Sequence, residues 1–218
     1  MNETLKEISE AMIARYSSRY QEMGYDVRTL GWGNNDQQKH RFLNAIDGIS
    51  IKPQSTILDI GCGFGDLLKT ITKFGFLPES YIGWDINPDL INEAKIRWAK
   101  STTKTAFEVV DLTSKLNRDS VADLGFMLGV LNLNFGDSYN NYDYSKSIIS
   151  KAFKCINKVL VIDFLSSHIT ANYPKEDFVF YHDPTIMLEF AFTLTPNVVL
   201  KHNYAPIPQK EFMLYLYK

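Results

Sequence analysis

Residues 57–68 read Ile-Leu-Asp-Ile-Gly-Cys-Gly-Phe-Gly-Asp-Leu-Leu and combine the patterns of a strand, a turn and a helix. The stretch begins as an apolar run that contains one carboxylate, breaks at Gly61, Gly63 and Gly65, and resumes with apolar residues at helical spacing. Because glycine has no side chain, such a turn lets the backbone approach a nucleotide-like ligand closely. The stretch therefore predicts a strand, a tight turn and the start of a helix at a ligand-binding corner.

Apolar strands alternate with helices along most of the chain. The predicted strands cover residues 56–60, 81–85, 107–110, 124–128 and 159–162. Near-continuous apolar strands separated by helices predict a buried parallel sheet in a doubly wound α/β fold. Two more strands are predicted at residues 198–202 and 212–217, and the link between them is too short for a helical crossover. We therefore expect this C-terminal strand pair to be antiparallel.

Two helices are predicted ahead of the first strand. An apolar stripe that includes Tyr16 and Tyr20 indicates an amphipathic helix, which either packs on the core or closes over a pocket as a lid. A Leu-Gly-Trp-Gly turn at residues 30–33 follows, and Asn35 or Asp36 is expected to cap the next helix. We expect residues 1–50 to form a helical N-terminal cap or lid, and residues 51–218 to form the main domain.

Composition and charge narrow the classes of function. The 218 residues are 45% hydrophobic and 22% charged, which is ordinary for a globular protein with a real core. The formal charge of -2 and the lack of a long basic run disfavour a nucleic-acid partner. The polar N-terminus and the lack of a window of about 20 apolar residues predict a cytoplasmic protein without a membrane span. Two cysteines are too few for a disulfide framework or a zinc cluster, so no metal site is predicted.

Three carboxylates lie at or near the ends of predicted strands, where ligands bind in such sheets. They are Asp59, Asp85 and Asp111. Asp85 lies 24 residues after Gly61, the distance at which a carboxylate can accept hydrogen bonds from ribose hydroxyls. Asp111 closes the third strand, where it can accept from an exocyclic amino group of a base. These positions predict a ligand with an adenosine part.

The glycine spacing indicates which such ligand is bound. Dinucleotide-binding turns place a pyrophosphate on the helix N-terminus. Here Asp66 follows Gly65, and a carboxylate at the helix start repels a pyrophosphate but tolerates a cation. The turn therefore favours a positively charged ligand.

With these residues and the antiparallel tail, the chain from about residue 55 to residue 218 is similar to the class I S-adenosylmethionine-dependent methyltransferases. That resemblance implies a Rossmann-like seven-stranded sheet. Residues 30–33 together with Gln38, Arg41 and Phe42 resemble a bacterial small-molecule subgroup with a Gly-Trp-Gly turn and a Gln-x-x-Arg-Phe helix. Members of that subgroup occur near surface-polysaccharide and secondary-metabolite pathways.

The resemblance implies that strand-end residues hold the cofactor, S-adenosylmethionine. Asp59 would organise the loop or meet the amino group, Asp85 would hold the ribose, Asp111 would frame the adenine edge, and Leu128 with Gly129 would lie near the sulfur. The residues expected to bind at the strand ends are Asp59, Gly61, Cys62, Gly63, Asp85, Ile86, Asp111, Leu112, Leu128 and Gly129.

The carboxylate of the methionine part needs a counter-charge or hydrogen-bond donors. Arg41 and Gln38 are the candidates, with Trp32 and Tyr20 closing over them. The alternative for Arg41 is a surface salt bridge, since arginine is usually exposed.

Candidate catalytic residues depend on the methyl acceptor. An alcohol needs a general base, most often histidine, whereas a phosphate or carboxylate oxygen is already anionic and needs cationic positioning. His182, just before an Asp-Pro helix start, and His168, after the fifth strand, are the candidate bases. For each, the alternative is a surface or capping hydrogen bond. The absence of an Asn/Asp-Pro-Pro-Tyr sequence after the fourth strand disfavours amino methylation of adenine or glutamine.

The sequence thus predicts a methyltransferase acting on an oxygen of a small polar metabolite. A sugar, a phosphate-bearing molecule or a capsule polysaccharide precursor is the expected acceptor, and the protein is expected to be a monomer or homodimer. Two alternatives remain. One is a regulatory protein that binds S-adenosylmethionine without transfer, and the other is an NAD-dependent oxidoreductase.

Overall fold

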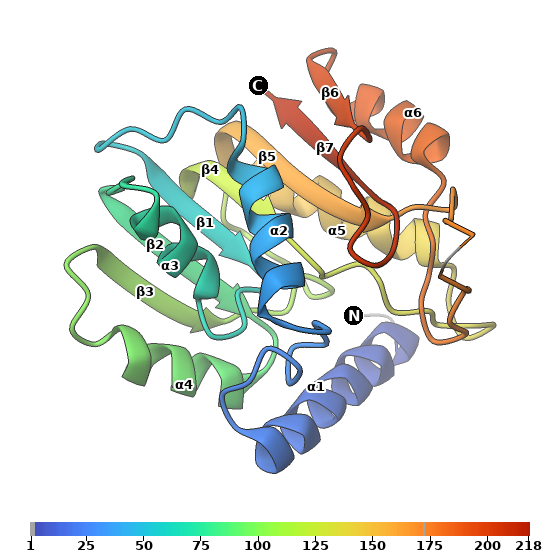
Figure 1. Ribbon diagram of the computed structural model, residues 1–218, viewed down its shortest axis with the longest axis horizontal. Helices are drawn as coiled ribbons and strands as arrows, with labels where there is room; N and C mark the ends of the chain where they lie inside the picture. The colour runs from blue at the N-terminus through green and yellow to red at the C-terminus, as the bar shows by residue number, and fades with distance from the viewer. Residues whose placement is uncertain (1–2, 172) are drawn as a thin grey trace.

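The structure of the chain, a computed structural model, describes residues 3–171 and 173–218, and its strands form one seven-stranded sheet (Figure 1). The elements are α1 (Glu3–Met23), α2 (Asn35–Ile46), β1 (Thr56–Ile60), α3 (Asp66–Lys73), β2 (Ser80–Asp85), α4 (Pro88–Trp98), β3 (Lys104–Val109), β4 (Ala122–Met127), α5 (Asn141–Lys154), β5 (Ile156–Leu165), α6 (Pro184–Leu194), β6 (Val198–Lys201) and β7 (Glu211–Tyr217).

The strand order is β3-β2-β1-β4-β5-β7-β6. Strands β1 to β5 pair in parallel, and β7 pairs antiparallel with both β5 and β6. The predicted doubly wound sheet with an antiparallel C-terminal pair is therefore confirmed. The order reverses beside β1, so the carboxyl ends of β1 and β4 form the crevice in which such sheets bind ligands.

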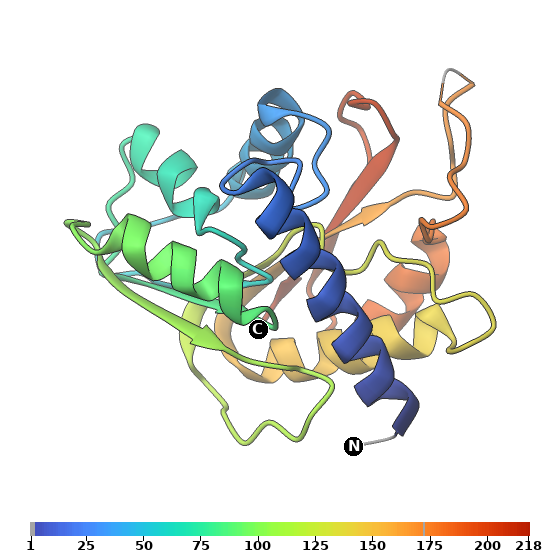
Figure 2. The same cartoon turned by 90° about the horizontal axis from the view of Figure 1, so that it is seen from below.

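Helices cover both faces of the sheet. Apolar side chains of α2, α3 and α4 share one buried cluster with one face, and those of α5 and α6 share a second cluster with the other. Figure 2 shows α2 and α3 on one side of the strands and α5 on the opposite side. Two layers of helices therefore cover the two faces of the sheet and leave the strand ends open to a ligand.

Helix α1 lies across the carboxyl ends of the parallel strands (Figure 1 and Figure 2). It is attached to the junction between β2 and α4, where Asn87 Nδ2 donates to the carbonyl of Ile13 at 3.0 Å and Ser17 Oγ donates to Asp89 at 2.6 Å. Asn87 is also the N-cap of α4 and accepts from the amide of Leu90. One asparagine thus fixes both the start of α4 and the position of α1.

Two local predictions are corrected. Helix α2 is capped by Asn34, not by Asn35 or Asp36, because Asn34 has extended backbone and its side chain accepts from the Gln37 amide at 3.0 Å. Strand β5 runs on to Leu165 because β7 pairs with it along that length, which puts Asp163 inside the sheet. No helix among the described residues is both long and apolar enough to cross a membrane.

Candidate functional site

A cavity opens at the carboxyl ends of β1 to β4, and we call it the strand-end cavity. It is lined by the turn that follows β1, by residues after β2, β3 and β4, and by side chains of α1, α2 and α5. Its space is about 990 Å³ with the open mouth included, at the upper end of small-molecule sites. The predicted cofactor residues that line it are Trp32, Gln38, Asp59, Gly61, Cys62, Gly63, Asp85, Ile86, Asp111, Leu112, Leu128 and Gly129.

The glycine turn is fixed by its own geometry and by one carboxylate. Gly63 has a φ of +51°, and a Cβ added there would lie 2.8 Å from the Leu30 side chain. The Gly63 amide donates to Asp85 Oδ2 at 2.9 Å, and the Asn87 amide donates to Asp85 Oδ1 at 2.9 Å. Asp85 therefore joins the turn after β1 to the turn after β2. Burial raises the pKa of the Asp85 carboxyl, although these amide donors oppose the shift.

The other strand-end carboxylates are also held in place. Asp59 accepts from the hydroxyl of Tyr81, and Asp111 accepts from the Thr113 amide at 2.7 Å. Burial raises the pKa of Asp59 to about 7, against the lowering effect of the Tyr81 hydrogen bond. Burial and nearby carboxylates raise the pKa of the Cys62 thiol as well, so Cys62 stays a protonated wall residue rather than a nucleophile.

Three side chains on the cavity wall have a buried polar atom without a hydrogen-bond partner among the described residues: Trp84, through its indole nitrogen, and the two charged or amide groups of Asp66 and Gln38. Asp66 Oδ1 accepts from the Tyr25 hydroxyl at 2.6 Å, but Oδ2 has no hydrogen-bond partner among the described residues. The side-chain amide nitrogen of Gln38 likewise has none in the part of the chain that the structure describes. Because unpaired buried polar atoms are costly, these two are the natural contacts for a cationic group and an anionic group of a ligand.

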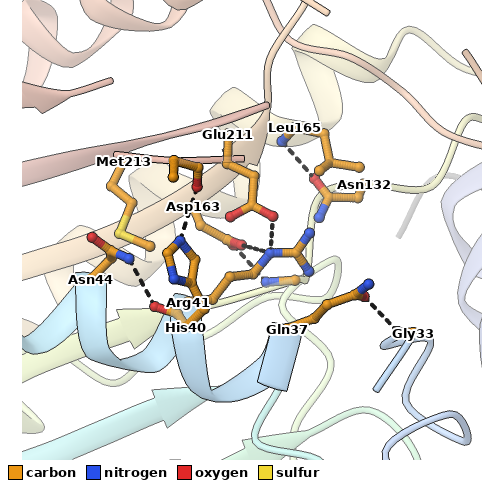
Figure 3. Close-up of polar contacts among 12 residues, drawn as sticks. Gly33, Gln37, His40, Arg41, Asn44, Asn132, Asp163, Leu165, Glu211 and Met213 are labelled. Carbon is orange, nitrogen blue, oxygen red and sulfur yellow. Dashed lines mark hydrogen bonds and ion pairs between the residues drawn. The ribbon is translucent and has the colours of Figure 1, made fainter. Parts of the chain in front are cut away.

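Arg41 does not line the strand-end cavity. Figure 3 shows its guanidinium between the carboxylates of Asp163 and Glu211; the Nε ion-pairs with Glu211 and lies 3.9 Å from Asp163. Its other face stacks on Trp32, with 4.6 Å from Cζ to the ring centroid. Two buried carboxylates require a nearby positive charge, and Arg41 supplies it. Arg41 therefore lies behind Trp32 and does not reach the cavity in which it was predicted to bind a ligand carboxylate.

The ion-pair cluster supports the wall of the cavity from behind. Asp163 Oδ1 accepts from the Gly129 amide at 2.6 Å, and Trp32 packs so closely that a Cβ on Gly129 would meet its ring at 3.1 Å. Gly129 has a φ of +77°, a conformation that favours glycine. Asp163 and Trp32 therefore fix the turn that follows β4. Asp163 was not predicted as a site residue because its strand was expected to end at residue 162.

Tyr20 also lies outside the strand-end cavity. Its hydroxyl donates to Glu93 of α4 at 2.8 Å, which turns the side chain toward α4. Tyr16, one helical turn earlier, lines the cavity together with Met12. Both tyrosines lie on one apolar stripe, and the stripe alone does not show which of them faces a ligand. Other lining residues that were not predicted include Leu30, Asp66, Trp84 and Tyr144.

The two candidate catalytic histidines are not at the cavity. His182 is fully buried, its Nε2 lies 2.9 Å from Ser145 Oγ, and its ring packs against Phe164 and Phe180. Burial lowers the pKa of His182 to about 3, so the ring is neutral. His168 is exposed, and its ring lies 5.8 Å from that of His202. His182 is thus part of the buried core, and neither His182 nor His168 lines the strand-end cavity.

A second cavity adjoins the first, and we call it the arginine cavity because Arg15, Arg19, Arg28 and Arg41 line it. Its space is about 1450 Å³ with the mouth included. Residues of the loop between β5 and α6, among them Glu176 and Phe178, form its far wall. The residues that line both cavities, and so form the junction between them, are Tyr16, Leu30, Trp32 and Gly129.

Comparisons with known proteins agree with this geometry. Residues 57–160 match the model of a family described as a methyltransferase domain. No curated protein matches the sequence.

Solved structures with the same fold are distant in sequence. Magnesium protoporphyrin IX methyltransferase from Synechocystis, with bound S-adenosylhomocysteine (SAH), has a TM-score of 0.68 at 15% identity over 99% of this chain and 100% of that one. A small RNA methyltransferase has a TM-score of 0.65 at 17% identity over 84% of this chain and 26% of that one. A SAM-dependent methyltransferase from Aquifex aeolicus has a TM-score of 0.55 at 15% identity, over 81% of this chain and 88% of that one.

Proposed function

We propose that the chain, a class I S-adenosylmethionine-dependent methyltransferase by its match to a methyltransferase-domain family over residues 57–160, methylates an oxygen of a small polar metabolite. S-adenosylmethionine supplies an electrophilic methyl group, so the protein needs to supply alignment, a dry cavity and a suitably ionised acceptor. The observation that carries the proposal is the junction at which the strand-end cavity opens onto the arginine cavity.

The strand-end cavity fits S-adenosylmethionine by its chemistry. The free oxygen of Asp66 suits a cationic group, and the free side-chain amide of Gln38 suits the carboxylate of the methionine part. Asp85 keeps lone pairs for ribose hydroxyls beyond its two backbone donors. Ile86, Leu112 and the turn at Gly61 and Gly63 supply the apolar and close-backbone contacts that an adenosine ligand needs.

The arginine cavity is the proposed site of the acceptor. Among the described residues it shares four with the strand-end cavity, so an acceptor held there faces the donor across Tyr16, Leu30, Trp32 and Gly129. Trp32 is buried, Gly129 is fixed by Asp163, and Tyr16, Leu30 and Trp32 give the junction an apolar or aromatic lining. An apolar junction of this kind favours exclusion of water from the reacting atoms.

A small polar acceptor is supported by the polar lining of the arginine cavity and by the net charge of -2, which disfavours RNA. The fold itself does not select the acceptor, because proteins similar to this one include a porphyrin and a small RNA methyltransferase. The proposal of a sugar or capsule polysaccharide precursor rests on the Gly-Trp-Gly and Gln-x-x-Arg-Phe resemblance alone.

The test is release of SAH from S-adenosylmethionine in the presence of acceptor panels: sugars, sugar phosphates, organic acids and phenols. We expect turnover with one class of small oxygen acceptor and methylated product by mass spectrometry. Product methylated on nitrogen or carbon, or turnover with RNA alone, would contradict the proposal.

A regulatory binding protein is the second candidate. It is favoured by one observation: no histidine lines either cavity within residues 3–171 and 173–218. Tight SAH binding in calorimetry without turnover on any panel would support it. Tight binding of NAD in the same experiment would instead support the oxidoreductase alternative.

A further inference from the structure

Helix α1 presents two different faces to the two cavities. Met12 and Tyr16 line the strand-end cavity, and Arg15 and Arg19 line the arginine cavity. Residues four apart lie one above the other on a helix, so Arg15 and Arg19 form a vertical pair on one side of Tyr16. The pair therefore lies directly beside the junction through which the acceptor meets the donor.

The charges of the arginine cavity are unequally compensated. Arg41 is paired with Glu211 and Asp163, and Arg28 is paired with Asp26 at 2.8 Å. Arg15 and Arg19 form no ion pair in the part of the chain that the structure describes. The excess positive charge of this cavity is thus concentrated on the two α1 residues.

The contacts that Arg15 and Arg19 do make leave their guanidinium donors largely free. Arg15 lies over the ring of Phe178, 5.8 Å from Cζ to the centroid, so the far wall of the cavity supports its side chain. Arg19 donates through one terminal nitrogen to the carbonyl of Arg28, while its Nε is buried without a partner among the described residues. A buried charged donor without an acceptor is costly, and a ligand oxygen would remove that cost.

The acidic group on the opposite wall forms no ion pair with Arg15 or Arg19 among the described residues. Glu176 lines the arginine cavity, and its Oε1 instead accepts from the Tyr173 hydroxyl at 2.6 Å. Aromatic stacking and a fixed backbone contact pre-orient both guanidinium groups, and planar guanidinium groups bind carboxylate and phosphate oxygens in pairs of hydrogen bonds.

We propose that Arg15 and Arg19 bind a carboxylate or phosphate group of the methyl acceptor, which is therefore an anionic small molecule. The inference rests on the proposed function, because it assumes that the acceptor occupies the arginine cavity. In this arrangement the anionic group anchors the acceptor at α1, and the rest of the molecule reaches the junction at Tyr16. Cationic positioning replaces the histidine that neither cavity contains among its described residues.

Anion binding to the SAH-loaded protein tests the pair directly. The probes are citrate for a carboxylate and inorganic pyrophosphate for a phosphate, titrated by calorimetry at constant ionic strength. The variant carries Arg15→Gln and Arg19→Gln, which keep helix-forming side chains and remove both charges. The matched control is Arg118→Gln, which breaks a surface ion pair with Glu108 outside both cavities.

We expect at least one probe to bind the wild-type protein and the control, and to bind the double variant about tenfold more weakly or worse. Whichever probe binds identifies the group as carboxylate or phosphate. A variant with Arg15→Lys and Arg19→Lys should recover part of the affinity, since lysine keeps the charge but loses the paired hydrogen bonds.

Two results would overturn the inference: no binding of either probe to the wild-type protein, or equal binding to the double variant. The affinity for SAH is measured on each variant first. It distinguishes a protein that lacks the proposed anion site from a protein that does not bind the cofactor product at all. The double variant should keep wild-type SAH affinity, because neither arginine lines the strand-end cavity. Lack of SAH binding to the wild-type protein would contradict the proposed function itself.

Discussion

Asp85 holds the strand-end cavity together while facing its ligand. Each of its carboxylate oxygens accepts one backbone amide, from Gly63 and from Asn87, both at 2.9 Å. A carboxylate has about four acceptor positions, so it can still accept from a ribose hydroxyl beyond these amides. The same side chain therefore shapes the glycine turn and recognises the ligand, and its removal should affect both.

We expect Asp85→Ala to weaken SAH binding about tenfold or more, because two turn contacts and the ribose contacts are lost together. Isothermal calorimetry on the folded variant measures this change. Asp47→Ala is the matched control, since Asp47 is exposed at the end of α2 and its side chain forms an ion pair with Lys201, away from the strand-end cavity. Wild-type affinity in a folded Asp85→Ala protein would show that Asp85 does not hold the cofactor.

The Arg41 cluster contains two buried carboxyl groups and one guanidinium. Burial raises the pKa of Glu211 from 4.5 to about 7, and the nearby Asp163 adds to the shift while Arg41 opposes it. Burial also raises the pKa of Asp163. One proton shared within the cluster therefore balances its charge near neutral pH.

This proton makes folding stability depend on pH. Because the folded pKa of Glu211 lies above its unfolded value, the stabilisation is fully present below about pH 4.5 and is lost as the pH rises through about 7. Glu211→Gln should flatten the fall in the free energy of unfolding between about pH 5 and about pH 8, by at most about 3 kcal/mol. Urea unfolding at both pH values measures it. Asp59 contributes the same pH dependence to the wild-type protein and to the Glu211→Gln variant. The same fall in the free energy of unfolding in both would therefore mean that Glu211 does not take up a proton.

At the scale of elements, α1 shows where prediction from the sequence ends. The apolar stripe identified the helix and its two possible roles, but Tyr16 and Tyr20 lie on the same stripe. The rotation of α1 is set by Ser17, which donates to Asp89, and by Tyr20, which donates to Glu93, both on α4. Those partners are more than 70 residues away in the sequence, and no local pattern announces them.

Substitution of the two tyrosines distinguishes a residue that lines the cavity, Tyr16, from one that holds α1 against α4, Tyr20. We expect Tyr16→Ala to weaken SAH binding about fivefold to tenfold, because a buried aromatic contact at the junction is lost. Tyr20→Ala should change SAH affinity by less than about twofold and lower stability by about 1 kcal/mol, through loss of the Glu93 contact. Calorimetry and urea unfolding on both variants distinguish these effects. Equal losses of SAH affinity in the two variants would show that both tyrosines contact the ligand, and that α1 turns a different face toward the cavity than the one described.

The glycine turn and the strand ends were predictable because their signals are local. Gly61, Gly63 and the carboxylates Asp59, Asp85 and Asp111 lie at the cavity where the strand pattern put them. Arg41 and His182 were not predictable in this way. Arg41 forms ion pairs with Asp163 and Glu211, and His182 contacts Ser145 and aromatic side chains such as Phe180. These partners are distant in the sequence and come together only in the folded sheet. A polar residue type shows that a partner exists, but only the fold shows whether that partner is a ligand.

At the scale of the whole molecule, the strand-end cavity exists only when distant segments meet. Its wall runs from Met12 of α1 to Ile148 of α5 and includes the ends of four strands. The carboxylates gather on the sheet side, whereas the uncompensated cations Arg15 and Arg19 lie across the junction. A donor with a cationic centre and an anionic acceptor would thus each meet the opposite charge on its own side.

Since no single segment forms this wall, SAH should bind the folded chain and not the unfolded one. At a concentration about 100 times its dissociation constant it should add about 2.7 kcal/mol to the free energy of unfolding and raise the melting temperature, whereas NAD should not. Hydrogen exchange should slow in α1 around Met12 and Tyr16, because the ligand joins this helix to the strand ends. The β6–β7 pair lies at the far edge of the sheet and provides the internal control. A rise in melting temperature with unchanged local exchange in α1 would mean that the helix is not part of the binding wall.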